Sequence, residues 1–172
     1  MWGFGLLIGL ILLFGLVVLR GAPYVPSKRR EVRQAFTELY PLGRDDLVVD
    51  IGSGDGIVLR EAVRRGARAM GYELNPVLVL ISRWLSRHEA DVTVRLADFW
   101  FVSLPPDTTV VYTFGESRDI ARMAKKVANE ATRLNKPLVF ISYGFMVPGQ
   151  QPHKQLGAYH LYQYAPLHIE KP

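Results

Sequence analysis

The chain has 172 residues, of which 49% are hydrophobic and 22% are charged. That length suffices for one α/β domain with a proper core plus an appendage, and it excludes two enzymatic domains. The net charge of +5 favours acidic partners, and the absence of cysteine excludes disulfides, thiolate metal sites and cysteine nucleophiles.

The first feature along the chain is an apolar segment, residues 2–19, which carries no charged or strongly polar side chain. As a helix it would rise about 1.5 Å per residue and cover roughly 27 Å, against a hydrocarbon core of about 30 Å. A cleaved signal peptide is the alternative, but no basic residue precedes the run and no convincing small-residue cleavage site follows it. The sequence therefore predicts an uncleaved transmembrane helix as a membrane anchor over residues 1–20.

Basic residues follow this segment closely and none precedes it. They are Arg20, Lys28, Arg29, Arg30 and Arg33. By the positive-inside rule we expect a single-pass membrane protein with its C-terminal domain on the cytoplasmic side, or on the matrix side in an organelle. The lipid bilayer is then a predicted partner, with anionic head groups against the basic cluster.

Residues 21–43 are predicted to form a connector and a basic helix. Pro23 and Pro26 fix their own φ and bias the preceding residues away from helix, so the connector should be stiff and extended. Ser27 is the predicted N-cap of the helix that follows. The apolar positions of that helix recur at helical spacing, and they are Val32, Phe36 and Leu39.

Residues 44–172 are predicted to form the main domain, because strand and helix patterns alternate along them. This alternation is typical of an α/β fold with a doubly wound, mostly parallel sheet. Strands are expected near 47–51, 67–73, 92–97, 109–114 and 137–142, and helices near 56–65, 76–88 and 118–134. A last strand over 159–164 alternates in hydropathy and is expected to pack antiparallel at the far side.

The most informative stretch begins at Asp50, where an apolar strand ends in a carboxylate and three alternate glycines follow, Gly52, Gly54 and Gly56. Glycines let the backbone turn sharply and bring a ligand close to main-chain N–H groups. The dinucleotide fingerprint G-x-G-x-x-G would require a further glycine where the chain has Ile57. A Walker P-loop is excluded because no Gly-Lys-Ser/Thr follows.

Glu73 ends the second predicted strand, about 20 positions after the glycine loop begins. An acidic residue at that point of a parallel sheet can accept hydrogen bonds from both ribose hydroxyls. The spacing therefore predicts that a nucleotide-type cofactor lies between the glycine loop and Glu73.

These motifs resemble those of class I S-adenosylmethionine-dependent methyltransferases. More narrowly, the chain resembles the small, membrane-anchored protein-lysine methyltransferases whose eukaryotic members act on the ATP synthase c-subunit and the adenine nucleotide translocase. The resemblance covers most of the chain and rests on the apolar N-terminal segment, Pro23-Tyr24-Val25-Pro26, Asp50-Ile51-Gly52-Ser53-Gly54-Asp55-Gly56, Gly71-Tyr72-Glu73-Leu74-Asn75-Pro76 and Asp98-Phe99-Trp100.

The resemblance implies a Rossmann-like fold and S-adenosyl-L-methionine as cofactor. It implies that Tyr24 lies over the cofactor and that Asp98 accepts from the adenine amine, although Asp98 could instead cap a turn and the neighbouring aromatic residues could be ordinary core. The predicted cofactor contacts are Tyr24, Asp50, Gly52, Ser53, Gly54, Gly56, Glu73, Asn75, Asp98 and Phe99.

The resemblance also implies a protein lysine as the methyl acceptor. Methyl transfer from a sulfonium is an in-line displacement, so the protein mainly aligns a neutral nucleophile, and an aromatic pocket lowers the pKa of a lysine. A dedicated catalytic base is not obligatory. The candidates for that pocket follow the fourth and fifth strands, and they are Phe114, Glu116 and Tyr143.

Other acceptors and a different class of function stay open. A lipid, a quinone-like small molecule or RNA could accept the methyl group, and the chain could be a binding module that retains the cofactor without turnover. The four histidines show no metal-ligand spacing, so no metal is predicted. Nucleic acid is not favoured, because no aromatic-interleaved basic motif accompanies the positive charge.

Overall fold

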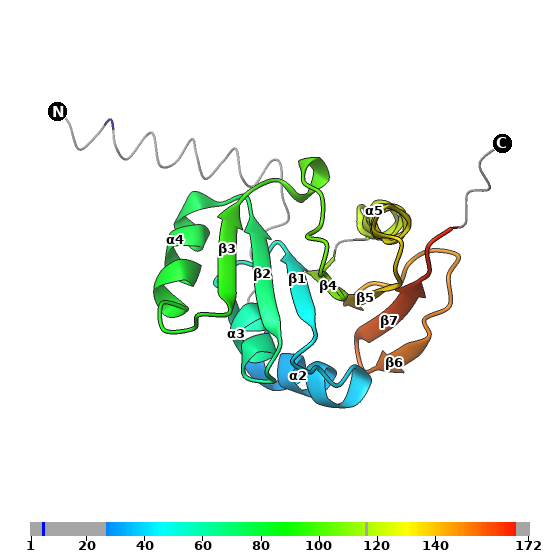
Figure 1. Cartoon of the computed structure of the whole chain (residues 1–172), viewed down its shortest axis with the longest axis horizontal. Helices are drawn as coiled ribbons and strands as arrows, with labels where there is room; N and C mark the ends of the chain where they lie inside the picture. Colours follow the sequence, from blue (N-terminus) through cyan, green and yellow to red (C-terminus); the bar gives the residue numbers. More distant parts are fainter. Residues whose placement is uncertain (1–4, 6–26, 116, 168–172) are drawn as a thin grey trace.

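The computed structural model describes residues 5, 27–115 and 117–167, which are drawn in colour in Figure 1. Within these residues, seven strands form one sheet in the order β3-β2-β1-β4-β5-β7-β6. The strands are β1 (Leu47–Ile51), β2 (Arg68–Glu73), β3 (Val92–Leu96), β4 (Val110–Phe114), β5 (Leu138–Tyr143), β6 (Lys154–Leu156) and β7 (Tyr159–Tyr164). The helices are α2 (Arg29–Gln34), which continues as the π-helix η1 (Ala35–Leu39), α3 (Ile57–Val63), α4 (Pro76–Leu85), the 3-10 helix η2 (Phe99–Phe101) and α5 (Ile120–Leu134).

Tyr24, Glu116 and all of the predicted anchor except Gly5 lie outside the described residues. Among the residues that are described, no helix is both long enough and apolar enough to cross a membrane. The anchor over residues 1–20 and the boundaries of the three predicted segments therefore stay predictions.

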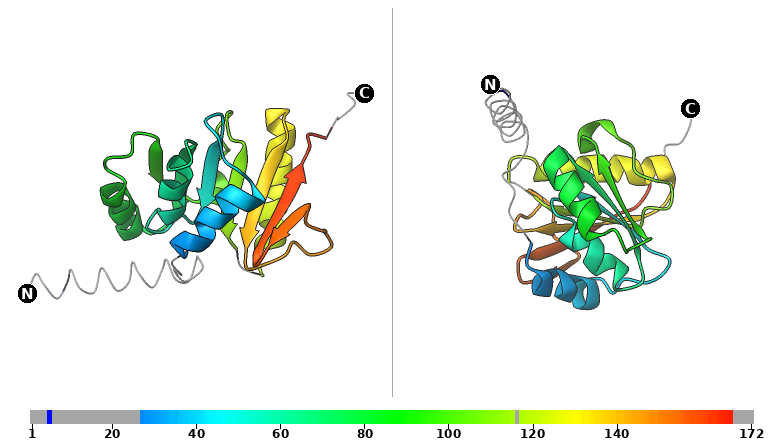
Figure 2. Two further views of the ribbon diagram at one scale, coloured as in Figure 1. Left: turned by 90° about the horizontal axis from the view of Figure 1, so that it is seen from below. Right: turned by 90° about the vertical axis from the view of Figure 1, so that its left-hand side faces the viewer.

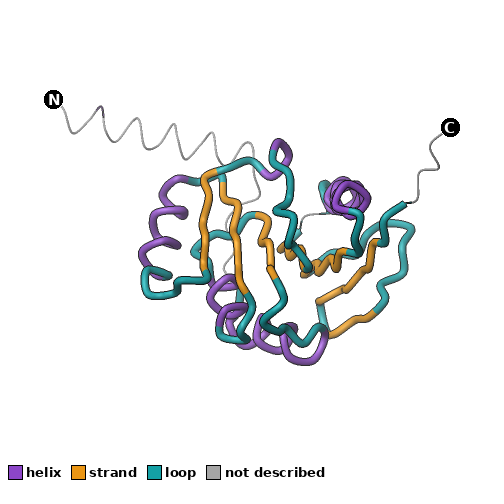
Figure 3. The backbone as a smooth tube through the Cα atoms, in the orientation of Figure 1, coloured by secondary structure: helices purple, strands orange, loops and turns teal. Residues whose placement is uncertain are grey.

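The sheet confirms the predicted doubly wound, mostly parallel arrangement. Strands β3, β2, β1, β4 and β5 run parallel, and β7 pairs antiparallel with β5, as the alternation over 159–164 predicts. The sequence analysis missed β6, which pairs antiparallel with β7 at the sheet edge (Figure 3). A three-residue strand is too short to show a period of two in its hydropathy.

The two faces of the sheet are covered by different helices (Figures 1 and 2). Val48 and Val110 belong to the core cluster formed with α2, α3 and α4, whereas Val49 and Val111 belong to the cluster formed with α5. Successive residues of a strand point to opposite faces, so the central strands must be apolar throughout. The β-branched pairs Val48-Val49 of β1 and Val110-Val111 of β4 meet that requirement, whereas the buried Asp50 near the end of β1 is an exception.

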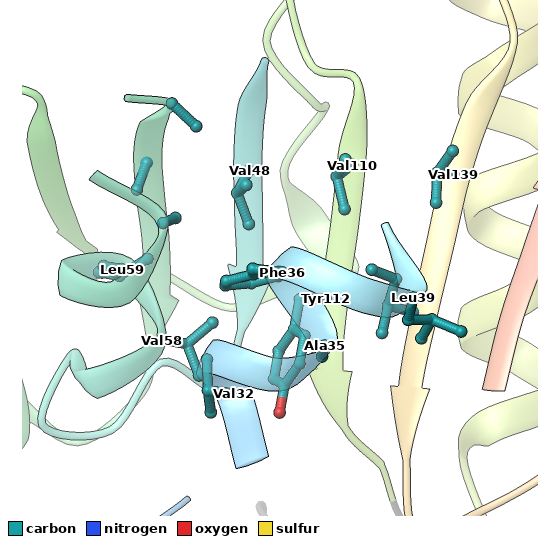
Figure 4. Close-up of a cluster of buried hydrophobic side chains, with 14 of the residues drawn as sticks. Val32, Ala35, Phe36, Leu39, Val48, Val58, Leu59, Val110, Tyr112 and Val139 are labelled. Atoms are coloured by element: carbon teal, nitrogen blue, oxygen red, sulfur yellow. The ribbon is translucent and has the colours of Figure 1, made fainter. Parts of the chain in front are cut away.

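The helix α2–η1 lies across one face of the sheet, where its buried residues pack against β1, β4 and β5 (Figure 4). The buried residues Val32, Phe36 and Leu39 are those that the helical spacing predicts. The predicted cap is wrong: Lys28 occupies the N-cap position, and its side chain makes no capping hydrogen bond to the backbone but donates to Glu31 Oε1 at 3.2 Å. The Ser27 hydroxyl instead lies beside the Tyr112 phenol.

This helix runs from the side of the sheet where the parallel strands have their carboxyl ends, called the carboxyl edge below, to the side where they have their amino ends. In its first turn, Glu31 accepts a hydrogen bond from the hydroxyl of Tyr143, the last residue of β5, at 2.7 Å. At its other end, Tyr40 donates to Asp46, which precedes β1, at 3.2 Å. The continuous segment that starts at residue 27 therefore begins at the carboxyl edge of the sheet, where the glycine loop also lies.

Helices α2 and α3 are joined by a buried carboxylate, Glu61, which has no exposed surface. Its Oε1 atom lies 2.5 Å from Arg29 Nε and 2.5 Å from Arg64 Nη1. Arg33 and Arg65 approach its other oxygen at 3.9 and 4.0 Å. Burial alone would raise the pKa of Glu61, but the hydrogen bonds and ion pairs with Arg29 and Arg64 lower it overall.

We expect the substitution Glu61→Gln to lower the free energy of unfolding at neutral pH by about 1–3 kcal/mol, because a neutral amide cannot pair with these guanidinium groups. A carboxyl whose pKa is lowered by folding stabilises the fold above its unfolded pKa and loses that contribution as the pH falls through its folded pKa. The difference between the free energies of unfolding of wild type and variant, measured with urea, should therefore become smaller in acid. Glu38→Gln, on the exposed side of η1, is the control. Equal stability of wild type and Glu61→Gln at neutral pH would contradict the ion-pair account.

Candidate functional site

The glycine loop after β1 requires its three alternate glycines. Gly52, Gly54 and Gly56 have φ values of 74°, 54° and 80°, in the left-handed region that other residues avoid. At Gly56 a side chain would also collide with α4, because an added Cβ would lie 2.2 Å from Ser82 Oγ. The predicted sharp turn is confirmed, and it brings the end of β1 against β2 and α4.

The N–H groups of this loop are turned inward. Gly52 and Ser53 donate to the carbonyl of Tyr72 at 2.9 and 3.0 Å. Gly54 donates to Oε2 of Glu73 at 2.8 Å. A phosphate-binding loop instead directs its N–H groups at the ligand. This loop therefore suits a nucleoside-type ligand better than one that carries phosphate.

Glu73 is held in one orientation at the end of β2. Its Oε2 accepts from Gly54 N and its Oε1 accepts from Asn75 N, each at 2.8 Å. The residue is buried. A carboxylate oxygen has two lone pairs, so each oxygen retains the capacity to accept one more donor. Two such oxygens at the carboxyl edge of a parallel sheet match the two hydroxyls of a ribose.

Asp50 is the second carboxyl group of the site, and only 2% of its surface is exposed. None of the described residues donates a hydrogen bond to it. Burial raises its pKa well above the usual range, and the nearby carboxylates of Glu73 and Asp55 raise it further. A buried carboxyl group of this kind is suited to a ligand that brings a cation or a strong donor.

Asn75 and Ser53 shape the loop. The Asn75 side chain caps α4 by accepting from Val77 N at 2.9 Å. The buried Ser53 hydroxyl has no hydrogen-bond partner in the described structure, and a Cβ at Gly71 would lie 2.4 Å from it. Direct contacts from Asn75 and Ser53 to a cofactor stay predictions.

At the end of β3, Asp98 does act as a cap, since its Oδ1 accepts from Trp100 N at 2.9 Å. Its other carboxylate oxygen remains available, so a contact to adenine stays a prediction. Phe99 is buried in the cluster on the α5 face, with Lys126 Nζ 5.0 Å from its ring centroid. Little of the Phe99 ring is left for a ligand.

An aromatic cluster follows the ends of β4 and β5. Phe114 and Tyr143 meet edge to face with their ring centroids 4.8 Å apart, and the Tyr159 ring centroid lies 4.7 Å from that of Tyr143. The hydrogen bond from Tyr143 to Glu31 lowers the pKa of that carboxyl group, so Glu31 stays ionised at neutral pH. We call these four residues, Phe114, Tyr143, Tyr159 and Glu31, the aromatic–carboxylate cluster.

This cluster shares an edge with the glycine loop. Asp50 of β1 stands opposite Tyr112 of β4 in the sheet register, and the Tyr112 ring lies 6.2 Å from that of Tyr159. A ligand held by the loop would therefore lie near the cluster. The structure brings the predicted Phe114 and Tyr143 together, whereas Glu116 falls outside the described residues.

Comparison with known proteins identifies the family. Residues 50–154 match the ANTKMT methyltransferase domain, and they include the glycine loop and Glu73. The chain belongs to this family. This finding confirms the resemblance drawn from the motifs.

Curated relatives match over part of their length. The chain is 37% identical to an ATP synthase c-subunit lysine N-methyltransferase of Xenopus laevis over 111 residues, which are 63% of this chain and 48% of that protein. It is 43% identical to an adenine nucleotide translocase lysine N-methyltransferase of Mus musculus over 86 residues, which are 48% of this chain and 37% of that protein. The chain thus spans about half or less of the length of these family members.

Solved structures show the same fold. An RNA methyltransferase from Salinibacter ruber, in complex with S-adenosyl-L-homocysteine, superposes with a TM-score of 0.71 at 24% identity and covers 86% of this chain and 98% of its own. The 23S rRNA methyltransferase ErmE gives a TM-score of 0.55 at 18% identity, over 70% of this chain and 48% of its own. At such identity the likeness concerns the fold alone, and it confirms the predicted Rossmann-like methyltransferase architecture.

Two members of the cluster, Glu31 and Tyr159, were missed by the sequence analysis. Glu31 lies 112 positions from its partner Tyr143, and nothing in a basic helical segment marks one acid as special. Tyr159 was placed on a strand, but only the register shows that it pairs with Tyr143.

In the described residues, no group of three or more possible ligands could hold a metal ion.

We expect Asp50→Asn to raise the stability of the ligand-free protein above neutral pH. A carboxyl whose pKa is raised by folding makes a contribution to stability that is fully present below its unfolded pKa and is lost as the pH rises through the folded pKa. The amide cannot ionise and so escapes this loss. In urea unfolding, the free energy of unfolding of the variant should exceed that of wild type in mild alkali, and the two values should become equal in acid. The control Asp45→Asn, in an exposed loop, should follow wild type; a less stable Asp50→Asn in alkali would contradict the assignment.

Proposed function

We propose that this chain is an S-adenosylmethionine-dependent methyltransferase that methylates protein lysine at a membrane surface. The observation that carries the proposal is the pair of buried carboxyl groups at one glycine loop, of which Glu73 is fixed by backbone donors and Asp50 has no donor among the described residues. Family membership supports the reaction class.

The residues of the loop fit this cofactor. S-adenosylmethionine joins a nucleoside to an amino acid without phosphate, which agrees with loop N–H groups that are used inside the fold. Glu73 would accept from the ribose, Asp50 would pair with the α-ammonium group, and the remaining oxygen of Asp98 would accept from adenine. When bound, the cofactor supplies a methyl group on a sulfonium. The protein then has only to hold an acceptor in line with it.

The aromatic–carboxylate cluster supports a lysine acceptor. Glu31 accepts from Tyr143 on one oxygen and pairs with Lys28 Nζ at 3.2 Å on the other. Its remaining acceptor capacity and the ring faces of Tyr143 and Phe114 would together attract an ammonium group. The same rings exclude water, and an apolar surrounding disfavours the charged amine, so it promotes the neutral form that can attack. Both relatives described above carry lysine N-methyltransferase in their names, for the ATP synthase c-subunit and for adenine nucleotide translocase.

A membrane location is the second part of the proposal. The apolar segment 2–19 would form the single-pass anchor, with the domain on the cytoplasmic side or on the matrix side of an organelle. The segment from residue 27 onward starts at the carboxyl edge of the sheet, beside Tyr112 and Tyr143. A connector from residue 20 to residue 27 spans at most roughly 25 Å. The site would therefore stay near the head groups, within reach of juxtamembrane lysines.

The direct test is to incubate the purified full chain with methyl-labelled S-adenosylmethionine and fractionated membranes. We expect label in protein, recovered after hydrolysis as methylated lysine. The matched acceptor control is a membrane fraction whose amines have been blocked by acetylation, which should take no label. Label in lipid or in RNA would overturn the choice of acceptor, and no transfer to any fraction would overturn the reaction.

Replacing Glu73 by glutamine should weaken binding of S-adenosylhomocysteine. The amide has one oxygen in place of two and loses its charge, so we expect a loss of about 2–3 kcal/mol, or roughly 30- to 150-fold in affinity. Calorimetric titration measures it. Glu38→Gln, at an exposed position on η1, is the control, and equal affinity of Glu73→Gln and wild type would remove Glu73 from the site.

Substitutions in the aromatic–carboxylate cluster should affect the acceptor and spare the cofactor. We expect Glu31→Gln and Tyr143→Phe each to raise KM for a lysine peptide about five-fold, which corresponds to about 1 kcal/mol. Affinity for S-adenosylhomocysteine should stay unchanged. Glu38→Gln, farther along the same helical segment, is again the control. If neither variant alters KM, lysine is not bound by this cluster.

Deleting residues 1–20 tests the tether. Because a tether raises the effective concentration of acceptors in the same membrane, the truncated chain should lose rate mainly on a membrane-embedded acceptor. Its rate on the soluble peptide of the same sequence should be retained. An equal loss on both acceptors would show that the segment does not select the substrate.

A further inference from the structure

Helix α4 exposes an apolar face. We call the residues on this face, namely Val77, Leu80, Ile81, Trp84 and Leu85, the α4 stripe; all five are exposed, Leu80 to 65% and Trp84 to 63%. They recur at a spacing of three and four residues, which aligns them along one side of a helix. The opposite side of α4 contains the buried Val79 and Ser82, which face the sheet and α3. The stripe therefore points away from the domain.

A helix on the surface of a soluble domain normally presents charged side chains to water. A continuous apolar stripe with a tryptophan marks a surface that meets another phase or molecule. At the carboxyl end of β3, Leu96 is also exposed, to 56%. Leu96 lies two residues after the buried Val94 on β3, so both side chains point to the face of the sheet that α4 covers.

The rim of the stripe is basic. Arg87 stacks over the Trp84 ring with its guanidinium carbon 4.8 Å from the ring centroid. Arg83 donates two hydrogen bonds to the carbonyl of Val94, at 3.1 and 2.8 Å, and so is fixed beside the helix. Tryptophan and leucine on one side with arginine at the boundary is the composition of helices that lie in the head-group region of a bilayer.

The neighbouring helices carry the same sign of charge. On α2 and α3, Arg29, Arg33, Arg64 and Arg65 surround the single carboxylate of Glu61. Because four arginines surround one carboxylate, this cluster keeps a net positive charge. The four arginine side chains are partly exposed, whereas Glu61 is buried. An anionic surface would be attracted to this side of the sheet.

We propose that the α4 stripe is seated in the head-group region of an anionic bilayer, as a contact separate from the predicted anchor. Both α2 and α4 begin at the carboxyl edge of the sheet, α4 directly behind Glu73 and Asn75. Contact through α4, together with a short connector into α2, would limit rotation of the domain about its tether. The carboxyl edge would then be held at a fixed distance from the head groups. This contact is independent of methyl transfer and would exist in an inactive chain.

The test exploits the absence of cysteine from the sequence. Single substitutions Leu80→Cys and Trp84→Cys in the full chain provide unique sites for a nitroxide label, and Lys125→Cys, exposed on α5 across the sheet, provides the control. The chains are reconstituted in vesicles of phosphatidylcholine and phosphatidylserine. We expect the ratio of oxygen to nickel-chelate accessibility to be several-fold higher at positions 80 and 84 than at position 125.

Two results would overturn the proposal. If the labels at positions 80 and 84 are as accessible to the nickel chelate as the label at position 125, the stripe faces water. Labels shielded from both oxygen and nickel would mean that protein covers the stripe, either a second copy or residues 1–26 of the same chain. The bilayer contact does not require turnover, so a chain without methyltransferase activity would leave it intact and would count against the proposed reaction only.

Discussion

The site depends on one carboxylate. Glu73 ends β2 and receives the N–H groups of Gly54 and Asn75, one on each oxygen. These two bonds join the glycine loop after β1 to the turn between β2 and α4, so two segments that are separate in sequence are fixed at one edge of the sheet. The left-handed glycines allow the loop to reach that carboxylate, and any side chain at Gly56 would push α4 away.

The second carboxyl group of the site, Asp50, differs from Glu73 in its hydrogen bonding. Glu73 is satisfied by the fold, whereas Asp50 is buried against neighbouring negative charge without a described donor. Under the proposed function, the free protein tolerates this unfavourable burial because the ligand brings the missing positive charge. A polar group that destabilises the empty fold and is completed by a ligand is a usual mark of a binding site. The same reasoning explains why the loop N–H groups can be used internally: the proposed cofactor has no phosphate to receive them.

Much of the fold could be predicted from the sequence, because it depends on local patterns. Runs of β-branched residues specify β1 and β4, the alternate glycines specify the turn, and the spacing to Glu73 specifies the next strand end. The missed features depend on contacts between distant segments. The bond from Tyr143 to Glu31 and the ion pair of Arg29 with Glu61 follow from how α2 crosses the sheet, and no local pattern encodes that crossing. Ser27 was predicted to cap a helix because its residue type suits a cap, but it lies against Tyr112.

Under the proposed function, Asp50 and Glu73 together form a site for a cationic, phosphate-free nucleoside cofactor. Calorimetric titration with S-adenosylhomocysteine, repeated in buffers of different ionisation enthalpy, tests this pairing most directly. The ammonium group of the ligand favours the ionised form of Asp50, so wild type should bind and release protons to the buffer, and Asp50→Asn should bind more weakly and release none. The absence of binding, or the same proton release from both proteins, would contradict the account.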